Sequence, residues 1–236
     1  MKTLIALFSL LNVSLLQAQN ADDIINKHID AIGGTKMLSQ ANSIYTESGI
    51  EIMGSVAPTK TFIVNGKGYR SENIYNGQQI VQVVTDKNGW TINPYQGSES
   101  ATALPSELYV VSEDQVYVSD PLFNYAAHGG KVSFAGQEKV DNINAYKIKY
   151  TNKDNAVITY YIDPATYFII KSVRSGELMG QNVEVTTNYS NYKKTDYGIT
   201  IPFTSEMQMG QMNLTMNVNK AEVNKDIQMT IFDMPK

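Results

Sequence analysis

Residues 203–218 read FTSEMQMGQMNLTMNV, and this stretch decides the fold class. Apolar and polar side chains alternate along it with a period of two, which is typical of a β-strand with one buried face. A two-residue turn at Gly210-Gln211 would place every apolar residue on the same face of an antiparallel hairpin. The predicted pairs are Met209 with Met212, Met207 with Leu214, Ser205 with Met216, and Phe203 with Val218.

The apolar face of this hairpin holds four of the ten methionines of the chain. One interpretation is ordinary sheet core. The other is a deformable ligand wall, because unbranched thioether side chains fill irregular apolar space at little cost. The sequence leaves both interpretations open.

The rest of the chain is also predicted to be mainly β, because Ile, Val and Tyr are abundant and fit a pleated surface. Asn65-Gly66, Asn76-Gly77 and Asn88-Gly89 are turn dipeptides, since Asn and Gly tolerate a positive φ. Their spacing predicts an antiparallel meander over residues 44–93, with a further turn over residues 54–58, and a second meander follows over residues 132–223. We expect one continuous sheet rather than two domains.

Helical patterns occur at two places. Ile25, His28, Ile29 and Ile32 recur at helical spacing before Gly33-Gly34, and His28 is interpreted as a boundary histidine packed against the domain. Between the meanders, residues 101–130 lose the alternation and carry helix-start signals at Pro105 and at Asp120-Pro121, the second of which predicts a short helix over residues 121–128. This insertion is predicted to form a helical lid over one face of the sheet.

The first 18 residues read as an export signal, with Lys2 ahead of an apolar run from Leu4 to Leu16. The run is too short to span a bilayer, so no integral membrane segment is expected. Residues 19–236 are then a single domain in the periplasm, soluble after the signal is removed. The chain has no cysteine, which excludes disulfides, thiolate metal sites and a lipid-anchored cysteine. Its net charge of −4 argues against nucleic acid as a partner.

No motif in the sequence supports catalysis. Neither His28 nor His128 has an acid at metal or triad spacing, and no glycine-rich phosphate loop or Gly-x-Ser-x-Gly sequence is present. Glu47 and Glu51 share a strand face but lie roughly 13 Å apart, beyond the spacing of a catalytic carboxylate pair. We therefore expect no enzyme, no metal site and no cofactor.

Several short motifs, taken in order, resemble those of the LolA/LolB family of periplasmic lipoprotein carriers, and most closely its outer membrane lipoprotein-sorting branch of the Bacteroidetes type. The motifs are Ile32-Gly33-Gly34, Gly68-Tyr69-Arg70, the Asp86 to Trp90 hairpin, Asp120-Pro121-Leu122-Phe123-Asn124-Tyr125, and the closing Asp226, Phe232 and Pro235. The resemblance covers most of residues 21–236. It departs from the family at Asn65-Gly66, where the carriers have Arg-Pro, and at the end, where they have an extra segment.

The resemblance implies an incomplete antiparallel β-barrel with an N-terminal helix, wrapped around an apolar cavity and closed by a helical lid. It implies a carrier of lipid or of the acyl chains of lipidated proteins, with membrane-associated donor and acceptor proteins as further partners. The alternative is a non-enzymatic sensor or scaffold on the same fold, which binds a protein partner. The candidate cavity wall is Phe203, Met207, Met209, Met212, Leu214, Met216, Val218, Tyr69 and Trp90, and the candidate lid residues are Leu104, Leu108, Leu122 and Phe123.

Overall fold

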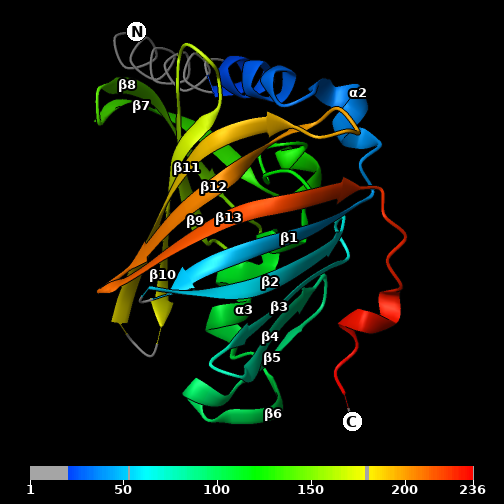
Figure 1. Cartoon of the computed structure of the whole chain (residues 1–236). Coiled ribbons are helices and arrows are strands. Elements are labelled where there is room, and N and C mark those ends of the chain that lie inside the picture. The colour runs from blue at the N-terminus through cyan, green and yellow to red at the C-terminus, as the bar shows by residue number, and fades with distance from the viewer. Residues whose placement is uncertain (1–20, 53, 179–180, 236) are drawn as a thin grey trace, which may run out of the picture.

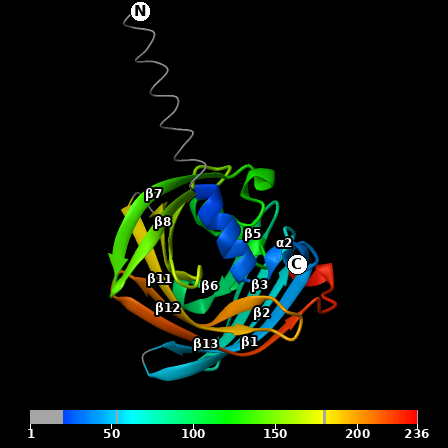
Figure 2. The same cartoon turned by 90° about the horizontal axis from the view of Figure 1, so that it is seen from above.

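The computed structural model describes residues 21–52, 54–178 and 181–235. They form one antiparallel sheet of thirteen strands that curls into an open half-barrel (Figures 1 and 2). The strand order is β6-β5-β4-β3-β2-β1-β13-β12-β11-β10-β9-β8-β7. The first and last strands of this order, β6 and β7, are not paired with each other, so the sheet does not close. The expected fold class is therefore confirmed.

The strands are β1 (Ser43–Ile52), β2 (Ser55–Val64), β3 (Gly68–Tyr75), β4 (Gln78–Thr85), β5 (Gly89–Asn93), β6 (Ser98–Ala103), β7 (Lys131–Val140), β8 (Ile143–Thr151), β9 (Val157–Ile162), β10 (Ile169–Leu178), β11 (Gln181–Lys194), β12 (Thr200–Met209) and β13 (Met212–Val223). The α-helices are residues 21–31, α2 (Gly34–Ser39) and α3 (Ser106–Ser112). Short 3-10 helices are η1 (Pro94–Gln96), η2 (Glu113–Val116), η3 (Tyr125–His128) and η4 (Met229–Phe232).

The hairpin that decided the fold class has the predicted register. Met209 pairs with Met212, Met207 with Leu214, and Ser205 with Met216. The turn at Asn76-Gly77 has the expected positive φ at both residues, 48° and 76°. The two meanders join through the pairing of β1 with β13, so the single continuous sheet is also confirmed.

Three local predictions are wrong. Strand β6 was not predicted, because its sequence, SESATA, has almost no apolar alternation. Pro58 was assigned to a turn, but it lies in β2 opposite Gly49. The helix expected over 121–128 is a turn followed by η3, although the Asp120 carboxylate does accept the Leu122 backbone N–H at 2.9 Å as a cap would.

Two apolar cores lie on opposite faces of the sheet. On the inner face, the N-terminal helix packs Ile25, Ile29 and Ile32 among residues of β8 and β9 such as Ile148 and Ile158. Figure 2 shows this helix lying across the end of the curled sheet. On the outer face, the C-terminal tail packs over β4 and β5 in a smaller core that contains Val81, Val83, Trp90 and Phe232. The expected export signal, residues 1–18, lies outside the described residues.

Candidate functional site

The methionine side chains of the β12–β13 hairpin lie on the inner face of the sheet. On β1, Ile44 belongs to the inner core and pairs with Ile63 of β2. The unbroken register between β1 and β2 keeps Ile50 on the same face as Ile44, and Ile50 pairs with Met216. From there the inner face continues across β13 and β12.

A second route across the sheet gives the same result. Met207 pairs with Thr187 of β11, Thr187 with Ser172 of β10, and Ser172 with Tyr160 of β9. Tyr160 is a member of the inner core. Directly paired residues of neighbouring strands share a face, so Met207 faces inward. We call Met207, Met209, Met212, Leu214 and Met216 the methionine wall.

The methionine wall is not part of either packed core. Met207, Met209 and Met212 are 40%, 39% and 50% exposed, and Leu214 and Met216 are half-buried. Their apolar surface lies at the β12–β13 end of the inner face. A contiguous exposed apolar patch of this kind marks a contact or ligand surface more often than a neutral one.

Residues 104–128 lie in the connection between the two edge strands β6 and β7 and pass over the inner face; we call them the covering segment. A Cβ atom at Gly176 of β10 would lie 2.6 Å from a methyl of Val111, so α3 rests directly on that strand. Leu104 similarly approaches Gly89 of β5. Leu122 and Phe123 are buried in the inner core, whereas Leu104 and Leu108 are half-buried. All four candidate lid residues thus belong to a segment on the inner side.

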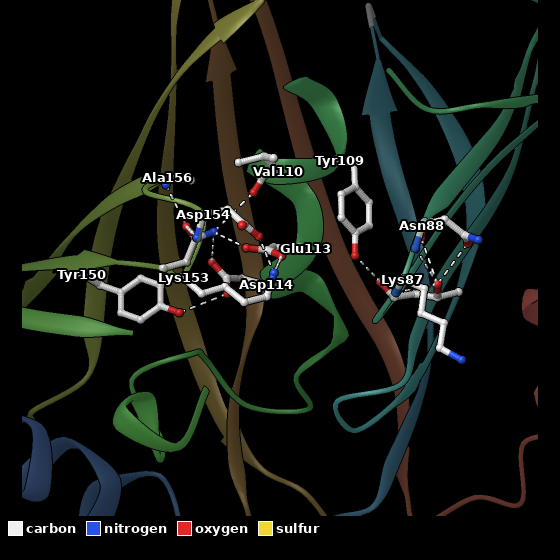
Figure 3. A network of polar contacts seen from close by, with 12 residues as sticks. Lys87, Asn88, Tyr109, Val110, Glu113, Asp114, Tyr150, Lys153, Asp154 and Ala156 are labelled. Atoms are coloured by element: carbon white, nitrogen blue, oxygen red, sulfur yellow. Dashed lines mark hydrogen bonds and ion pairs between the residues drawn. The ribbon is translucent and has the colours of Figure 1, made fainter. Parts of the chain in front are cut away.

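A polar network attaches the covering segment to both halves of the sheet (Figure 3). On one side, the Tyr109 hydroxyl donates to the Thr85 carbonyl at 3.0 Å. On the other side, Asn152 Nδ2 donates to Glu113 Oε1 at 2.7 Å, and the Tyr150 hydroxyl donates to Asp114 Oδ1 at 3.1 Å. These contacts therefore attach the covering segment to the end of β4 on one side and to the end of β8 on the other.

Both carboxylates of this network are buried, which has an electrostatic consequence. Glu113 and Asp114 are 7% and 8% exposed, and burial raises the pKa of each above its ordinary value. Lys153 forms an ion pair with Glu113 and a second one with Asp154. The charge of Lys153 and the amide donor of Asn152 offset part of the free-energy cost of burying these carboxylates. The network can therefore hold the covering segment in place.

A second attachment point joins the covering segment to the N-terminal helix. The His28 ring is buried, with Nε2 2.9 Å from Asp120 Oδ2 and Nδ1 2.8 Å from the Tyr167 carbonyl oxygen. Both neighbours are acceptors, so both ring nitrogens donate when the ring is an imidazolium. Burial lowers the pKa of His28, but the charge and hydrogen bond of Asp120 outweigh it, and the net pKa is raised.

The remaining candidate residues divide between the two faces. Tyr69 faces inward, because it pairs with Ile63 and Val84. Trp90 does not line the inner face, which corrects the sequence prediction: it is 2% exposed in the outer core, and its Nε1 donates to the Phe232 carbonyl at 2.9 Å. Phe203 and Val218 are half-buried, and the Lys193 ammonium lies 4.8 Å from the centre of the Phe203 ring.

Two hollows among the described residues lie elsewhere. One, of about 420 Å³, is on the outer side between Arg70, Glu72 and the C-terminal tail. The other, of about 70 Å³, lies beside Glu113, Lys153 and His128. Among residues 21–52, 54–178 and 181–235, no cluster of three or more His, Cys, Asp or Glu could hold a metal ion. Within the same ranges, no helix has the length and apolar character needed to cross a membrane.

Comparison with known proteins identifies the fold. No protein-family model matches the chain, and neither does any curated protein. Three similar solved structures are a LolA superfamily protein from Nitrosomonas europaea (11% identity, TM-score 0.60), a DUF1329 family protein from Desulfovibrio piger (14%, 0.59) and a domain assigned to the outer membrane lipoprotein-sorting proteins from Vibrio parahaemolyticus (11%, 0.58). They cover 92%, 92% and 90% of this chain, and each is matched over 97% of its own length. The expected LolA-like fold is therefore confirmed.

Proposed function

We propose that this protein is an exported, non-enzymatic carrier that holds the acyl chains of a lipid or lipidated protein against the methionine wall. The observation that carries the proposal is an apolar surface on the inner face that remains 39–50% exposed at Met207, Met209 and Met212. An acyl chain laid on this surface would remove apolar area from water on both partners.

The covering segment supports the same function. It lies over the inner face and is attached at both sides, by the Tyr109 and Glu113 contacts and by the His28–Asp120 pair. Movement of this segment would change how much of the inner face a ligand can reach. The Vibrio parahaemolyticus structure is named for outer membrane lipoprotein sorting, which supports lipidated proteins as cargo. The proposal also includes a periplasmic site of action and membrane-associated donor and acceptor proteins.

The proposal can be tested by introducing a carboxylate into the methionine wall. Met212→Asp and Leu214→Asp should abolish uptake of a fluorescent fatty acid, because an unpaired carboxylate would lie against the acyl chain. Since Met212 is half exposed, Met212→Asp should leave the thermal midpoint close to that of the wild type. Asn213→Asp is the matched control, because it adds the same charge to the opposite, exposed face of the same hairpin.

The result separates a ligand surface from ordinary packing. Lost uptake in Met212→Asp with an unchanged midpoint, and normal uptake in Asn213→Asp, supports the carrier. Uptake equal to that of the wild type in both wall variants contradicts it. Loss of both fatty-acid uptake and thermal stability would show that the methionine wall is ordinary sheet core.

A further inference from the structure

The inner face has a second wall that is polar and uncharged. Across β1, β2 and β3, Ser48 pairs with Thr59 and Thr59 with Asn73. A parallel row runs from Thr46 on β1 to Thr91 on β5. We call the following inward-facing residues the polar wall: Thr46, Ser48, Thr59, Thr61, Ser71, Asn73, Gln82, Thr91 and Asn93.

No charged residue occupies an inward position on the described part of β1–β5. Alternation along the strands puts the charged side chains on the outer face instead, at Glu47, Glu51, Lys60, Arg70 and Glu72. A charged ligand group on the inner side of these strands would lose water without meeting an opposite charge from them. Neutral hydrogen-bonding groups are therefore the chemistry that this wall accommodates.

Three atoms on this wall have no hydrogen-bond partner among the described residues. They are Ser48 Oγ, Asn73 Oδ1 and Asn93 Oδ1, and all three are shielded from solvent. Ser48 as a whole is only 4% exposed. Buried polar atoms in folded proteins are almost always paired, so three unpaired ones on one face require an explanation.

Other side chains of the polar wall do have hydrogen-bond partners within the chain. Thr59 Oγ1 donates to the Ala57 carbonyl at 3.2 Å, and Thr91 Oγ1 to the Val81 carbonyl at 2.8 Å. Gln82 Nε2 donates to Gln115 Oε1 of the covering segment at 3.1 Å. The unpaired atoms are thus exceptions, and two of them are amide oxygens, which accept hydrogen bonds.

The polar wall adjoins the methionine wall directly. Ser48 pairs with Val218, and Ile50, two residues further along β1, pairs with Met216. Ser48 and Asn73 lie two strands apart, which corresponds to roughly 10 Å across the sheet. One extended amphiphile can therefore contact both walls at once.

We propose that the polar wall binds the uncharged, hydrogen-bond-donating head of an amphiphile whose acyl chain lies on the methionine wall. The head donates a hydroxyl or amide proton to Asn73 Oδ1 and exchanges a hydrogen bond with Ser48 Oγ. This inference rests on the proposed carrier function and adds the class of cargo: neutral acyl lipids with donor groups.

Three probes with the same oleoyl chain test the inference: 1-oleoylglycerol, methyl oleate and oleate at pH 8. The wild type should bind 1-oleoylglycerol about three- to tenfold more tightly than methyl oleate, which has no donor, and should also prefer it to oleate. Ser48→Ala and Asn73→Leu should each reduce this ratio while the affinity for methyl oleate stays the same. Thr204→Ala is the control, because its hydroxyl donates to Asn217 Oδ1 on the outer face.

A stability measurement distinguishes a binding role from a structural one. Ser48→Ala removes an unpaired buried hydroxyl, so its thermal midpoint should equal or exceed that of the wild type. Equal affinity of the wild type for 1-oleoylglycerol and methyl oleate, or an unchanged ratio in both variants, would overturn the inference and leave the carrier function intact. A wild type that binds none of the three probes would instead contradict the carrier function itself.

Discussion

Removal of the His28 ring should weaken the fold in a pH-dependent way. His28 is 1% exposed and Asp120 18% exposed, and their ion pair joins the N-terminal helix to the covering segment. Removing one partner of a buried pair typically costs about 3–5 kcal/mol, because the other charge is left uncompensated. Asp120 reaches some solvent and keeps the Leu122 N–H, so we expect about 2–3 kcal/mol for His28→Gln. For a domain of this size, that corresponds to a thermal midpoint about 5–10 °C lower.

The pH dependence follows from the directions of the two pKa shifts. The pKa of His28 is raised above its ordinary value of 6.5. Its contribution to stability is therefore complete below pH 6.5 and disappears as the pH rises through the folded-state pKa. The pKa of Asp120 is lowered: burial raises it, but the His28 charge and hydrogen bond outweigh the burial. Its contribution is present above the ordinary value of 3.8 and is lost as the pH falls through the folded-state pKa.

Urea unfolding at pH 6 and pH 9 measures the effect. Trp90 is the only tryptophan of the chain and is buried, so its fluorescence reports the transition. The difference in unfolding free energy between wild type and His28→Gln should be larger at pH 6 than at pH 9. The double variant His28→Gln/Asp120→Asn should recover part of the loss, because no unpaired carboxylate remains.

The other histidine of the chain supplies the control. Burial lowers the pKa of His128, which is the opposite direction to the shift at His28, so His128 does not add stability at low pH as His28 does. His128→Gln should therefore leave the pH-dependent contribution of His28 unchanged. An equal destabilisation by His28→Gln at pH 6 and pH 9 would refute the assignment of a charged pair. It would show that His28 acts only by packing.

Two further predictions concern the outer core and the covering segment. Phe232→Ala should destabilise the protein by about 3–5 kcal/mol and expose Trp90 to quenchers, because Phe232 is 3% exposed and packs on the tryptophan; an unchanged unfolding midpoint would contradict this role of the tail. Gly176→Ala should push α3 away from β10, because the new Cβ would lie 2.6 Å from Val111. Amide exchange in residues 106–112 should then speed up, at a cost of about 1–3 kcal/mol, whereas Ser175→Ala, at an exposed position, should leave it unchanged.

The features that could be predicted from the sequence are those that depend on neighbouring residues. The register of the β12–β13 hairpin follows from alternation and a two-residue turn, so Met207 opposite Leu214 was predictable. Alternation also separates the two faces of each strand. The hydroxyls of Thr46 and Ser48 alternate with charged side chains, and this was the available signal for the polar wall.

The features that could not be predicted depend on contacts between distant residues. Alternation cannot tell which face of a strand is the inner one, so Trp90 was assigned to the wrong side. Its outward position depends on Phe232, which lies 142 residues further along the chain. The His28–Asp120 pair likewise joins residues 92 positions apart, and no local pattern connects them.

On the proposed function, the methionine wall determines how tightly the acyl chain binds, and the polar wall determines which head is selected. An acyl chain of 16 carbons gains roughly 12 kcal/mol from burial at about 0.8 kcal/mol per methylene. On a wall as open as Met207 and Met212, only part of that area is removed from water, and association costs about 4–15 kcal/mol. The net affinity should therefore be moderate, and a moderately bound chain dissociates quickly enough to be handed on. Selection between cargoes with the same chain must then come from the head, where an unmatched donor or charge is penalised most strongly. On the carrier function proposed above, this assigns release to the flexible methionine side chains and discrimination to the unpaired oxygens of Ser48 and Asn73.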